Sequence, residues 1–515
     1  MNTVQSAEGG GKLAAARAGS ALHLTTMRRG ACRGTPTTIA SLCALLVGTM
    51  ACAQSIAPAA PGIRADAPID ANRPYAQELN SSAAADLVIA AAGSVLIDSP
   101  AAKLPSWDPK VIELLNGKAS PPTTTVAVAD LQTTLIEAAT FAGYPYPWDG
   151  TRAYSAPTSI AAELKNQGLA MLALGNLHAL DWGIDGMRVT GEALDAAGLK
   201  HAGTGDREGL ARMAAFLEEP GGKGRIALLA TAISFRPTTN ALTSHGVAPG
   251  RPGISGIELT PLHLVPAQQR AQLQRMACRV QYPNDPGHCE HLASPPPAVS
   301  VFGRRFESGT TPNEDYTRDY ELNHVQAANE LRAVREAKQN SDLVVLSIST
   351  GELDLAEPSA TGSVSVLGRL AHAAIDAGAD LVMATGPPSL GPIEIYRSAG
   401  ALPRPILYGM GRLYYSAASA PTPDRPGDYD AIIVRRVVNA NRLTLEIYPI
   451  DLRAPDRPVG IPQLAGAARG REILERLQRL SAPFRTVIRS EAYGATVRGL
   501  IAVDGSAGPA AGQGT

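Results

Sequence analysis

The chain has 515 residues, of which 45% are hydrophobic and 18% are charged, and its formal net charge is −1. These values are ordinary for a globular protein, and the length suffices for one large domain or for two. Because the charge is near neutral and forms no basic stripe, the sequence argues against a nucleic-acid partner.

The N-terminus has the order of segments that is typical of a signal peptide. Basic residues follow Met27, an apolar run covers residues 39–50, and small residues for cleavage stand at 51–53. We therefore predict an upstream extension and signal peptide over residues 1–53, and an exported protein that is periplasmic or secreted. The apolar run is shorter than the roughly 20 residues of a membrane-spanning helix, so we expect no membrane span in the mature form. A single anchor helix and a lipid anchor at Cys52 remain alternatives.

A linker is expected over residues 54–84, and residues 85–501 then alternate predicted strands and helices, which indicates an α/β domain. Strands are expected over residues 87–91, 125–129, 169–173 and 225–233. A helix over residues 158–167 begins with Thr and Ser and ends before Gly168.

A Pro- and Gly-rich insertion over about residues 234–317 interrupts this alternation. A connection of this length without secondary structure is usually functional or mobile, and we interpret the insertion in that way. After it we expect helices over residues 323–340, 366–377 and 472–480, strands over 343–348 and 381–384, and a hairpin of residues 431–438 and 442–448. Residues 502–515 are rich in Gly and Ala and are expected to be a disordered tail.

The most informative segment follows the strand expected at residues 169–173. Asn176, His178 and Asp181 come directly after that strand, and sites in α/β proteins are built at the carboxyl ends of strands. Asn provides a neutral oxygen and His a ring nitrogen to a metal or a phosphate. The alternative is that His178 is a hydrogen-bonded structural residue, which is the more common role of a lone histidine after a strand.

This segment resembles the A-N-N-H-x-x-D-x-G motif of the capsule and poly-γ-glutamate biosynthesis family known as CapA. Three further segments resemble the family in the same order: GRPGISGIEL at residues 250–259, IDAGADLVMATGPPSLGPIEIY at 375–396 and PILYGMGRL at 405–413. The resemblance covers roughly residues 85–501. It implies a metallophosphoesterase-like fold, a four-layer α/β/β/α sandwich of two stacked sheets between helices, with a metal site at the strand ends.

At the positions where the family places metal ligands, this chain departs from the pattern. Ser94 replaces the first aspartate, Gln132 replaces a glutamate, and the histidines expected near Ser349 and Thr385 are absent. Leu177 stands in place of the second Asn of the motif. A two-metal site needs several anionic or imidazole ligands to hold cations about 3.5–4 Å apart, so the departures weaken this expectation.

Three candidate metal ligands remain at matching positions: Asp130, Asn176 and His178. We expect them to hold at most one weakly bound divalent ion, Mn, Mg or Zn. His178 and Asp181 are the candidate catalytic residues if the site is active.

Other residues near the motif positions are weaker candidates. Arg251 and Arg412 are candidates for contacts with an anionic substrate. Four acids near the motif positions would be needed to replace the missing metal ligands: Asp98, Glu352, Asp354 and Glu394. The alternative interpretation of each acid is a solvated loop residue or a turn residue.

The resemblance supports two hypotheses from different functional classes. The first is a non-catalytic or weakly catalytic capsule or poly-γ-glutamate biosynthesis protein. It would bind an anionic polymer or glycan of the cell envelope through a site whose metal is lost or weakened. The second is a metal-dependent, phosphoesterase-type hydrolase that uses Asp130, Asn176 and His178. The oligomeric state stays open.

Two cysteines, Cys278 and Cys289, lie downstream of the predicted cleavage position. His288 and His291 beside them suggest zinc, but zinc sites usually pair cysteines two to four residues apart. We therefore expect a disulfide between Cys278 and Cys289, as is common in exported proteins.

Overall fold

The structure is a computed structural model. It describes residues 87–101, 103–118, 124–146, 152–218, 224–234, 237–289, 298–301, 303–308, 317–351, 365–398, 402–417, 427–439, 442–455 and 457–504. The chain divides into two units, Met1–Ala67 and Pro68–Thr515, and every described residue lies in the second. The predicted signal peptide, the linker and the candidate ligands Glu352 and Asp354 lie outside the described residues, as does His291.

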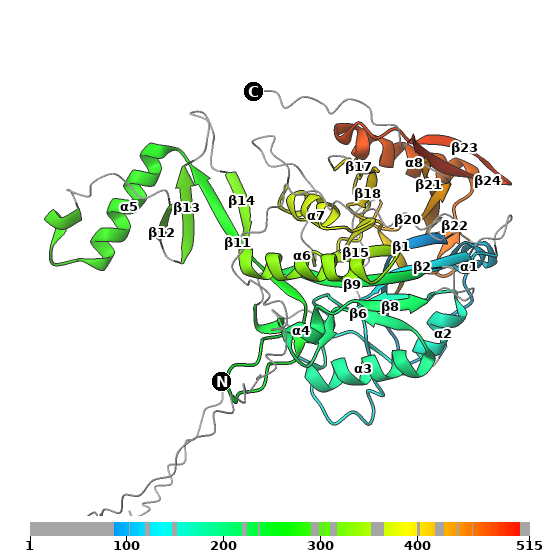
Figure 1. Cartoon of the computed structure of the whole chain (residues 1–515), viewed down its shortest axis with the longest axis horizontal. Helices are drawn as coiled ribbons and strands as arrows, with labels where there is room; N and C mark the ends of the chain where they lie inside the picture. The colour runs from blue at the N-terminus through cyan, green and yellow to red at the C-terminus, as the bar shows by residue number, and fades with distance from the viewer. Residues whose placement is uncertain are drawn as a thin grey trace, which may run out of the picture. The chain divides into compact units, whose positions relative to one another are not determined.

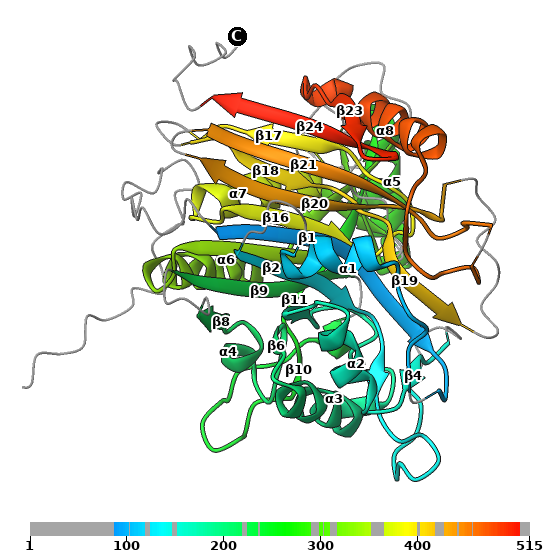
Figure 2. The ribbon, with the colours of Figure 1, turned by 90° about the vertical axis from the view of Figure 1, so that its right-hand side faces the viewer.

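Two large mixed sheets of ten strands each form the framework (Figures 1 and 2). The first sheet has the order β23-β24-β21-β20-β1-β2-β5-β6, with β19 paired to β1 and β22 paired to β21. Its strands are β1 Leu87–Asp98, β2 Thr124–Leu131, β5 Met171–Ala173, β6 Lys200–Ala202, β19 Arg412–Ala417, β20 Asp430–Asn439, β21 Arg442–Asp451, β22 Gln463–Leu464, β23 Arg489–Tyr493 and β24 Thr496–Asp504.

The second sheet has the order β12-β13-β11-β9-β15-β16-β18-β17, with β14 paired to β11 and β8 paired to β9. Its strands are β8 Ala215–Glu218, β9 Arg225–Ser234, β11 Gly256–Val265, β12 Ala298–Val301, β13 Arg304–Ser308, β14 Thr317–Leu322, β15 Leu343–Ser349, β16 Leu381–Thr385, β17 Ile393–Tyr396 and β18 Arg404–Leu407. Two small pairs complete the strands, β3 Thr134–Leu135 with β4 Ser155–Ala156, and β7 Thr204–Gly205 with β10 Gly253–Ile254.

Eight α-helices occur in the described part of the chain. They are α1 Pro109–Asn116, α2 Ile160–Asn166, α3 Gly183–Ala197, α4 Glu208–Ala211, α5 Ala267–Gln281, α6 His324–Gln339, α7 Val366–Asp376 and α8 Ala467–Ser481. None of the helices in these residues is long and apolar enough to cross a membrane.

The core strands are buried on both faces, which explains their continuous apolar sequences. Along β1, Ile89 and Ala91 point into a cluster shared with strands of the second sheet, whereas Ala90 and Ala92 point into a cluster that contains residues of α1 and α2. Residues of β9 and β15 alternate in the same way between the shared cluster and a third cluster, which contains residues of α6 and α7. The two sheets therefore face each other across a common core to which α8 also contributes, and helices that include α1, α2, α6 and α7 cover their other faces.

Most strands and helices expected from the sequence are confirmed, but their ends shift. β1 continues to Asp98, well beyond the expected residues 87–91. The last helix begins at Ala467, earlier than the expected 472, and includes Gly470. Gly470 packs against the side chain of Val497, where a larger residue would collide. Residues 502–504, expected to begin a disordered tail, continue strand β24.

The expectation that residues 234–317 lack secondary structure is wrong. Ser234 ends β9, and the described residues that follow form β10, β11, α5, β12 and β13. The first residues of β11 pair with β9, and its last residues pair with β13, so β11 carries the chain from the sheet into a separate arm. Figure 1 shows this arm, which contains α5, β12 and β13, at the left. Cys278 at the end of α5 and Cys289 are joined by a disulfide with a Cα–Cα distance of 5.6 Å.

Candidate functional site

The carboxyl ends of parallel strands in the first sheet bring the predicted site residues together. In the strand register, Ser94 of β1 pairs with Asp130 of β2, and Asp130 pairs with Ala173 of β5. Asn176 follows β5 after a turn of two residues. Residues that follow different strands in the sequence therefore lie close together at one edge of the sheet.

Glycines allow the two sheets to approach each other closely at this edge. A Cβ atom on Gly175 would lie 2.6 Å from the carbonyl carbon of Ala230 in β9 of the second sheet. The backbone of Gly203 packs in turn against Gly175, and Gly386 packs against Gly351 with a positive φ. The glycine immediately before Asn176 is therefore required by packing.

Asp130 is the centre of a buried hydrogen-bond network. Its side chain is 1% exposed. Asn176 Nδ2 donates to Asp130 Oδ1 at 2.9 Å and to the carbonyl oxygen of Leu131 at 2.8 Å. Gln132 Nε2 donates to the other carboxylate oxygen, Oδ2, at 2.9 Å. Burial raises the pKa of the Asp130 carboxyl, and the side chains of Asn176, Thr385 and Gln132 oppose that rise.

His178 is held in one orientation by Asp181. His178 Nδ1 lies 2.9 Å from Asp181 Oδ2, and that oxygen also accepts the backbone N–H of Tyr154 at 2.9 Å. The His178 backbone N–H donates to Asn176 Oδ1 at 3.0 Å, which links the pair to the Asp130 network. The His178 side chain is 24% exposed and that of Asp181 only 6%. A buried carboxylate thus orients a partly solvent-accessible imidazole.

The second sheet contributes uncharged groups to the same edge. Ser349 of β15 pairs with Thr385 of β16 in the strand register. The hydroxyls of Ser94 and Ser349 are buried and have no hydrogen-bond partner among the described residues. Leu177 lies against Gly351, so an aliphatic side chain occupies the space between the two sheets.

These residues do not fit a dinuclear metal centre. Each oxygen of Asp130 already accepts one amide N–H group and so keeps only one further lone pair for a cation. Asn176 directs its N–H group towards Asp130, and Gln132 is a donor where a glutamate would be an acceptor. Within the described ranges, no group of three or more His, Cys, Asp or Glu side chains is arranged to hold a metal ion.

The two candidate arginines lie on different elements. Arg412 begins β19 and pairs in register with Ser94, next to the Asp130 network. Its guanidinium lies over the ring of Tyr415, 4.6 Å from the centroid. Arg251 instead donates from Nε to the carbonyl oxygen of Asn240 at 3.1 Å, in the loop next to β10.

Two of the weaker candidate acids have other partners. Asp98, at the end of β1, forms an ion pair with Arg152. Glu394 accepts the hydroxyl of Tyr408 at 2.7 Å and lies 2.9 Å from His372 Nε2, in the second sheet and α7. Each carboxylate is thus already engaged with neighbouring side chains.

Arg152 and Arg412 lie near Tyr415, and Arg453 lies near Tyr429, which neighbours Tyr415; we call these three arginines the cationic rim. Burial raises the pKa of Tyr415, and the charges of Arg412 and Arg152 oppose this rise, as expected for close neighbours. Arg453 is exposed and lies over the ring of Tyr429, 4.4 Å from its centroid. Arg152 and Arg453 lie outside the family motifs, so the sequence did not indicate them as candidate binding residues.

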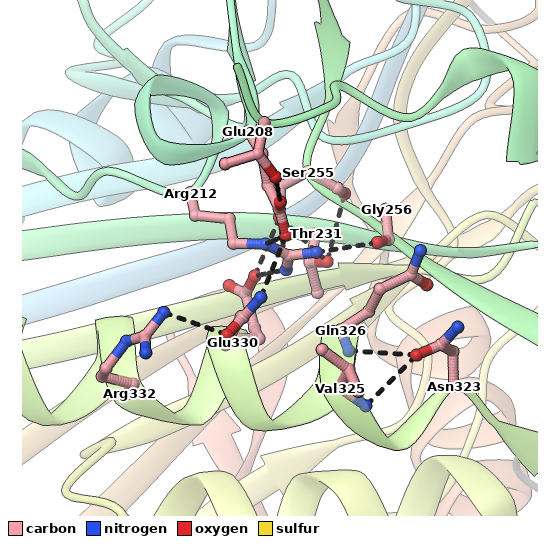
Figure 3. Close-up of polar contacts among 12 residues, drawn as sticks. Glu208, Arg212, Thr231, Ser255, Gly256, Asn323, Val325, Gln326, Glu330 and Arg332 are labelled. Atoms are coloured by element: carbon pink, nitrogen blue, oxygen red, sulfur yellow. Dashed lines mark hydrogen bonds and ion pairs between the residues drawn. The ribbon is translucent and has the colours of Figure 1, made fainter. Parts of the chain in front are cut away.

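A separate buried ion pair supports the turn that precedes Asn176 (Figure 3). Arg212 NH1 lies 2.7 Å from Glu330 Oε2 of α6, and Glu330 is fully buried. Ser255 Oγ also donates to Glu330 Oε2 at 2.8 Å. The backbone N–H of Ser255 donates to the carbonyl oxygen of Gly203 at 2.8 Å. Because Gly203 packs against Gly175, this cluster supports the turn that positions Asn176.

Comparison with known proteins agrees with this arrangement. A family model described as "Bacterial capsule synthesis protein PGA_cap" matches residues 88–416. Two proteins of Sinorhizobium fredii (strain NBRC 101917 / NGR234), named Uncharacterized protein y4sH and Uncharacterized protein y4uA, are each 30% identical over 408 residues. Those alignments cover 71% of this chain and 84% of each relative. The resemblance predicted from the motifs is therefore confirmed: the chain belongs to the PGA_cap family of bacterial capsule synthesis proteins, the CapA family.

Proposed function

We propose that this protein acts in the synthesis or assembly of an anionic capsule polymer, such as poly-γ-glutamate, by binding the polymer and without metal-dependent catalysis. We further propose that its two sheets and covering helices form the four-layer metallophosphoesterase-like sandwich of the family. The signal-peptide pattern supports an exported protein, periplasmic or secreted, with cleavage near Ala53. N-terminal sequencing of protein from the cell envelope tests the export, and an intact Met1 on cytoplasmic protein would contradict it.

The observation that carries the proposal is the way in which the charge of Asp130 is satisfied. In a metallophosphoesterase the cation would neutralise such a carboxylate and activate water. Here amide groups of Asn176 and Gln132 each donate to one of its oxygens. Each oxygen of the buried carboxylate thus has a hydrogen-bond partner within the protein, as in a structural group.

The cationic rim supports binding of an anionic polymer next to this closed centre. Arg152 is 39% exposed in its side chain, whereas the side chain of its partner Asp98 is only 13% exposed. A guanidinium has five N–H donors, so Arg152 can contact a ligand carboxylate and keep its contact with Asp98. Arginine also forms bidentate hydrogen bonds with carboxylates.

The test is calorimetric titration of the protein with poly-γ-glutamate, with neutral dextran as the ligand control. The double variant Arg152→Ala/Arg412→Ala should weaken binding at least about tenfold, because two charged hydrogen bonds are lost. Arg225→Ala is the matched control. Arg225 is 45% exposed, pairs with Glu218 and lies over the ring of Phe216. It begins β9, at the end of that strand opposite to the site. A double variant that binds as tightly as the unmodified protein would contradict the proposal.

A metal-dependent hydrolase that uses Asp130, Asn176 and His178 is the second candidate. The contact between His178 and Asp181 favours it, because a carboxylate that orients a histidine is a frequent arrangement around general bases. Turnover of a phosphoester that requires added metal and disappears in His178→Ala would establish this alternative and remove the first proposal.

A further inference from the structure

The outward face of helix α5 carries both apolar and basic side chains. The helix packs against β12 and β13, and Cys278 is its one buried residue. Large hydrophobic side chains are exposed at its end: Met276 is 46% exposed, Val280 63% and Tyr282 42%. Met276 and Val280 are four residues apart and lie on the same side of the helix. Clustered exposed apolar side chains mark surfaces of interaction.

The charges on the same helix have one sign. Its sequence, AQQRAQLQRMACRVQ, contains three arginines and no acidic residue. Arg275 and Arg279 are exposed and lie beside Met276 and Val280, one residue earlier along the chain. The outward face therefore combines an apolar strip with an adjacent cationic strip.

The arm presents this face in a fixed orientation. β11 pairs with both β13 and β14, which connects the arm to the second sheet. The Cys278–Cys289 disulfide ties the end of α5 to the turn that follows. In that turn, the rings of Tyr282 and His288 pack at a centroid distance of 4.8 Å.

We infer that this face of α5 binds the surface of an anionic phospholipid bilayer. Met276, Val280 and Tyr282 enter the boundary between headgroups and acyl chains, where amphipathic helices with basic polar faces lie. Arg275 donates charge-assisted hydrogen bonds to lipid phosphates. The protein thus lies on the membrane without spanning it.

The charge pattern favours a lipid surface over a second copy of this chain. A two-fold symmetric contact would place the same face of α5 opposite itself. A two-fold axis through the apolar strip would bring the adjacent arginine-bearing strips of both copies into one contact, to which α5 itself contributes no carboxylate.

The test is co-sedimentation of the chain from residue 54 onward with vesicles. Vesicles that contain phosphatidylglycerol should bind the protein at least about tenfold more tightly than pure phosphatidylcholine vesicles, and salt should weaken the binding. Met276→Glu/Val280→Glu should reduce binding at least tenfold, and Arg275→Ala should reduce it only on anionic vesicles. Val459→Glu is the matched control, because Val459 is 54% exposed outside the arm.

Three outcomes would overturn the inference. One is equal binding of both vesicle types, and another is vesicle binding that Met276→Glu/Val280→Glu leaves unchanged. The third is a dimer that this double variant dissociates while no vesicle binds, which would assign the face to a second copy. Because no capsule polymer is present, failure here is separate from failure of the proposed polymer binding. Circular dichroism shows whether each variant is folded.

Discussion

Gln132 illustrates how one atom changes the chemistry of the strand ends. A glutamate at this position would place a second carboxylate beside Asp130, and the two charges would need a cation between them. The amide of Gln132 instead donates to Asp130 Oδ2 at 2.9 Å. Because a donor replaces an acceptor, the side chain at this position hydrogen-bonds to Asp130 and no longer offers an oxygen ligand to a cation.

Gln132→Glu should therefore lower the free energy of unfolding by about 2–4 kcal/mol in the presence of EDTA at neutral pH, because a buried carboxylate loses a donor and gains a like charge. Added Mn should restore part of this loss. Gln132→Met is the control, since it removes the hydrogen bond without adding charge and should cost less. Urea denaturation measures all three proteins, and an unchanged midpoint for Gln132→Glu would refute the account of this network.

A second buried carboxylate, Asp380, lies among positive charges. Lys338 Nζ lies 2.9 Å from Asp380 Oδ2, and Arg404 Nε lies 3.0 Å from Oδ1. Burial alone would raise the pKa of Asp380, but the charges of Lys338, Arg404 and Arg436 lower it from 3.8 to about 2. Asp380 precedes β16, Lys338 is on α6 and Arg436 is on β20, so the cluster draws on both sheets and a helix.

Asp380→Asn should lower the free energy of unfolding by about 3–5 kcal/mol at pH 7, because buried cations lose their partner. A carboxyl whose pKa is lower in the folded state stabilises the protein above its unfolded pKa. This contribution should therefore disappear as the pH falls from about 4 through 2. Chemical denaturation of both proteins across this range tests the prediction, and a constant difference between them would contradict it.

At the scale of elements, a buried ion pair joins the end of α4 to α6, beside a hydrogen bond from Asn329 of α6 to Glu208 of α4. Arg212 follows α4 and contacts Glu330 of α6, and it also donates from NH2 to the carbonyl of Gly256 at 3.0 Å (Figure 3). Burial raises the pKa of Glu330, and the charge of Arg212 opposes this rise. The pair thus holds a short helix against a long one beside the turn before Asn176.

Arg212→Met should destabilise the protein by about 3–5 kcal/mol, because it leaves a buried carboxylate without its cation. Arg212→Met/Glu330→Met should recover much of that loss, since it removes both charges together. Thermal or urea unfolding compares the two variants. If the double variant is the less stable of the two, the assigned pairing is incorrect.

The arm gives a further prediction for a single element. Cys278 and Cys289 are 11 residues apart in sequence, and closing a loop of about this length contributes up to roughly 3 kcal/mol. The Cys278→Ser/Cys289→Ser variant should exchange amide protons faster in α5, whereas β9 and β15 should be unaffected. Mass spectrometry of exported protein should show a two-proton shift on reduction, and two free thiols without reductant would exclude the disulfide.

For the molecule as a whole, the sequence predicted the central strands and the family better than the site. β1, β9 and β15 are continuous apolar runs because both faces are buried, and such runs are visible in sequence. The fold of residues 234–317 was not predicted, since Pro- and Gly-rich sequence concealed β11 and α5. The expectation that Asn176 and His178 follow a strand is confirmed by β5, but the role of Gln132 as a donor and the position of Arg152 depend on the folded structure.

The central claim is that hydrogen bonds hold Asp130 in this member of the PGA_cap family and that it has no dinuclear metal centre. The most direct measurement is elemental analysis of the chain from residue 54 onward after incubation with Mn and Zn and dialysis. The account predicts less than one tightly bound metal ion per chain, because the remaining side chains cannot neutralise two dications. Two stoichiometric ions per chain would contradict it.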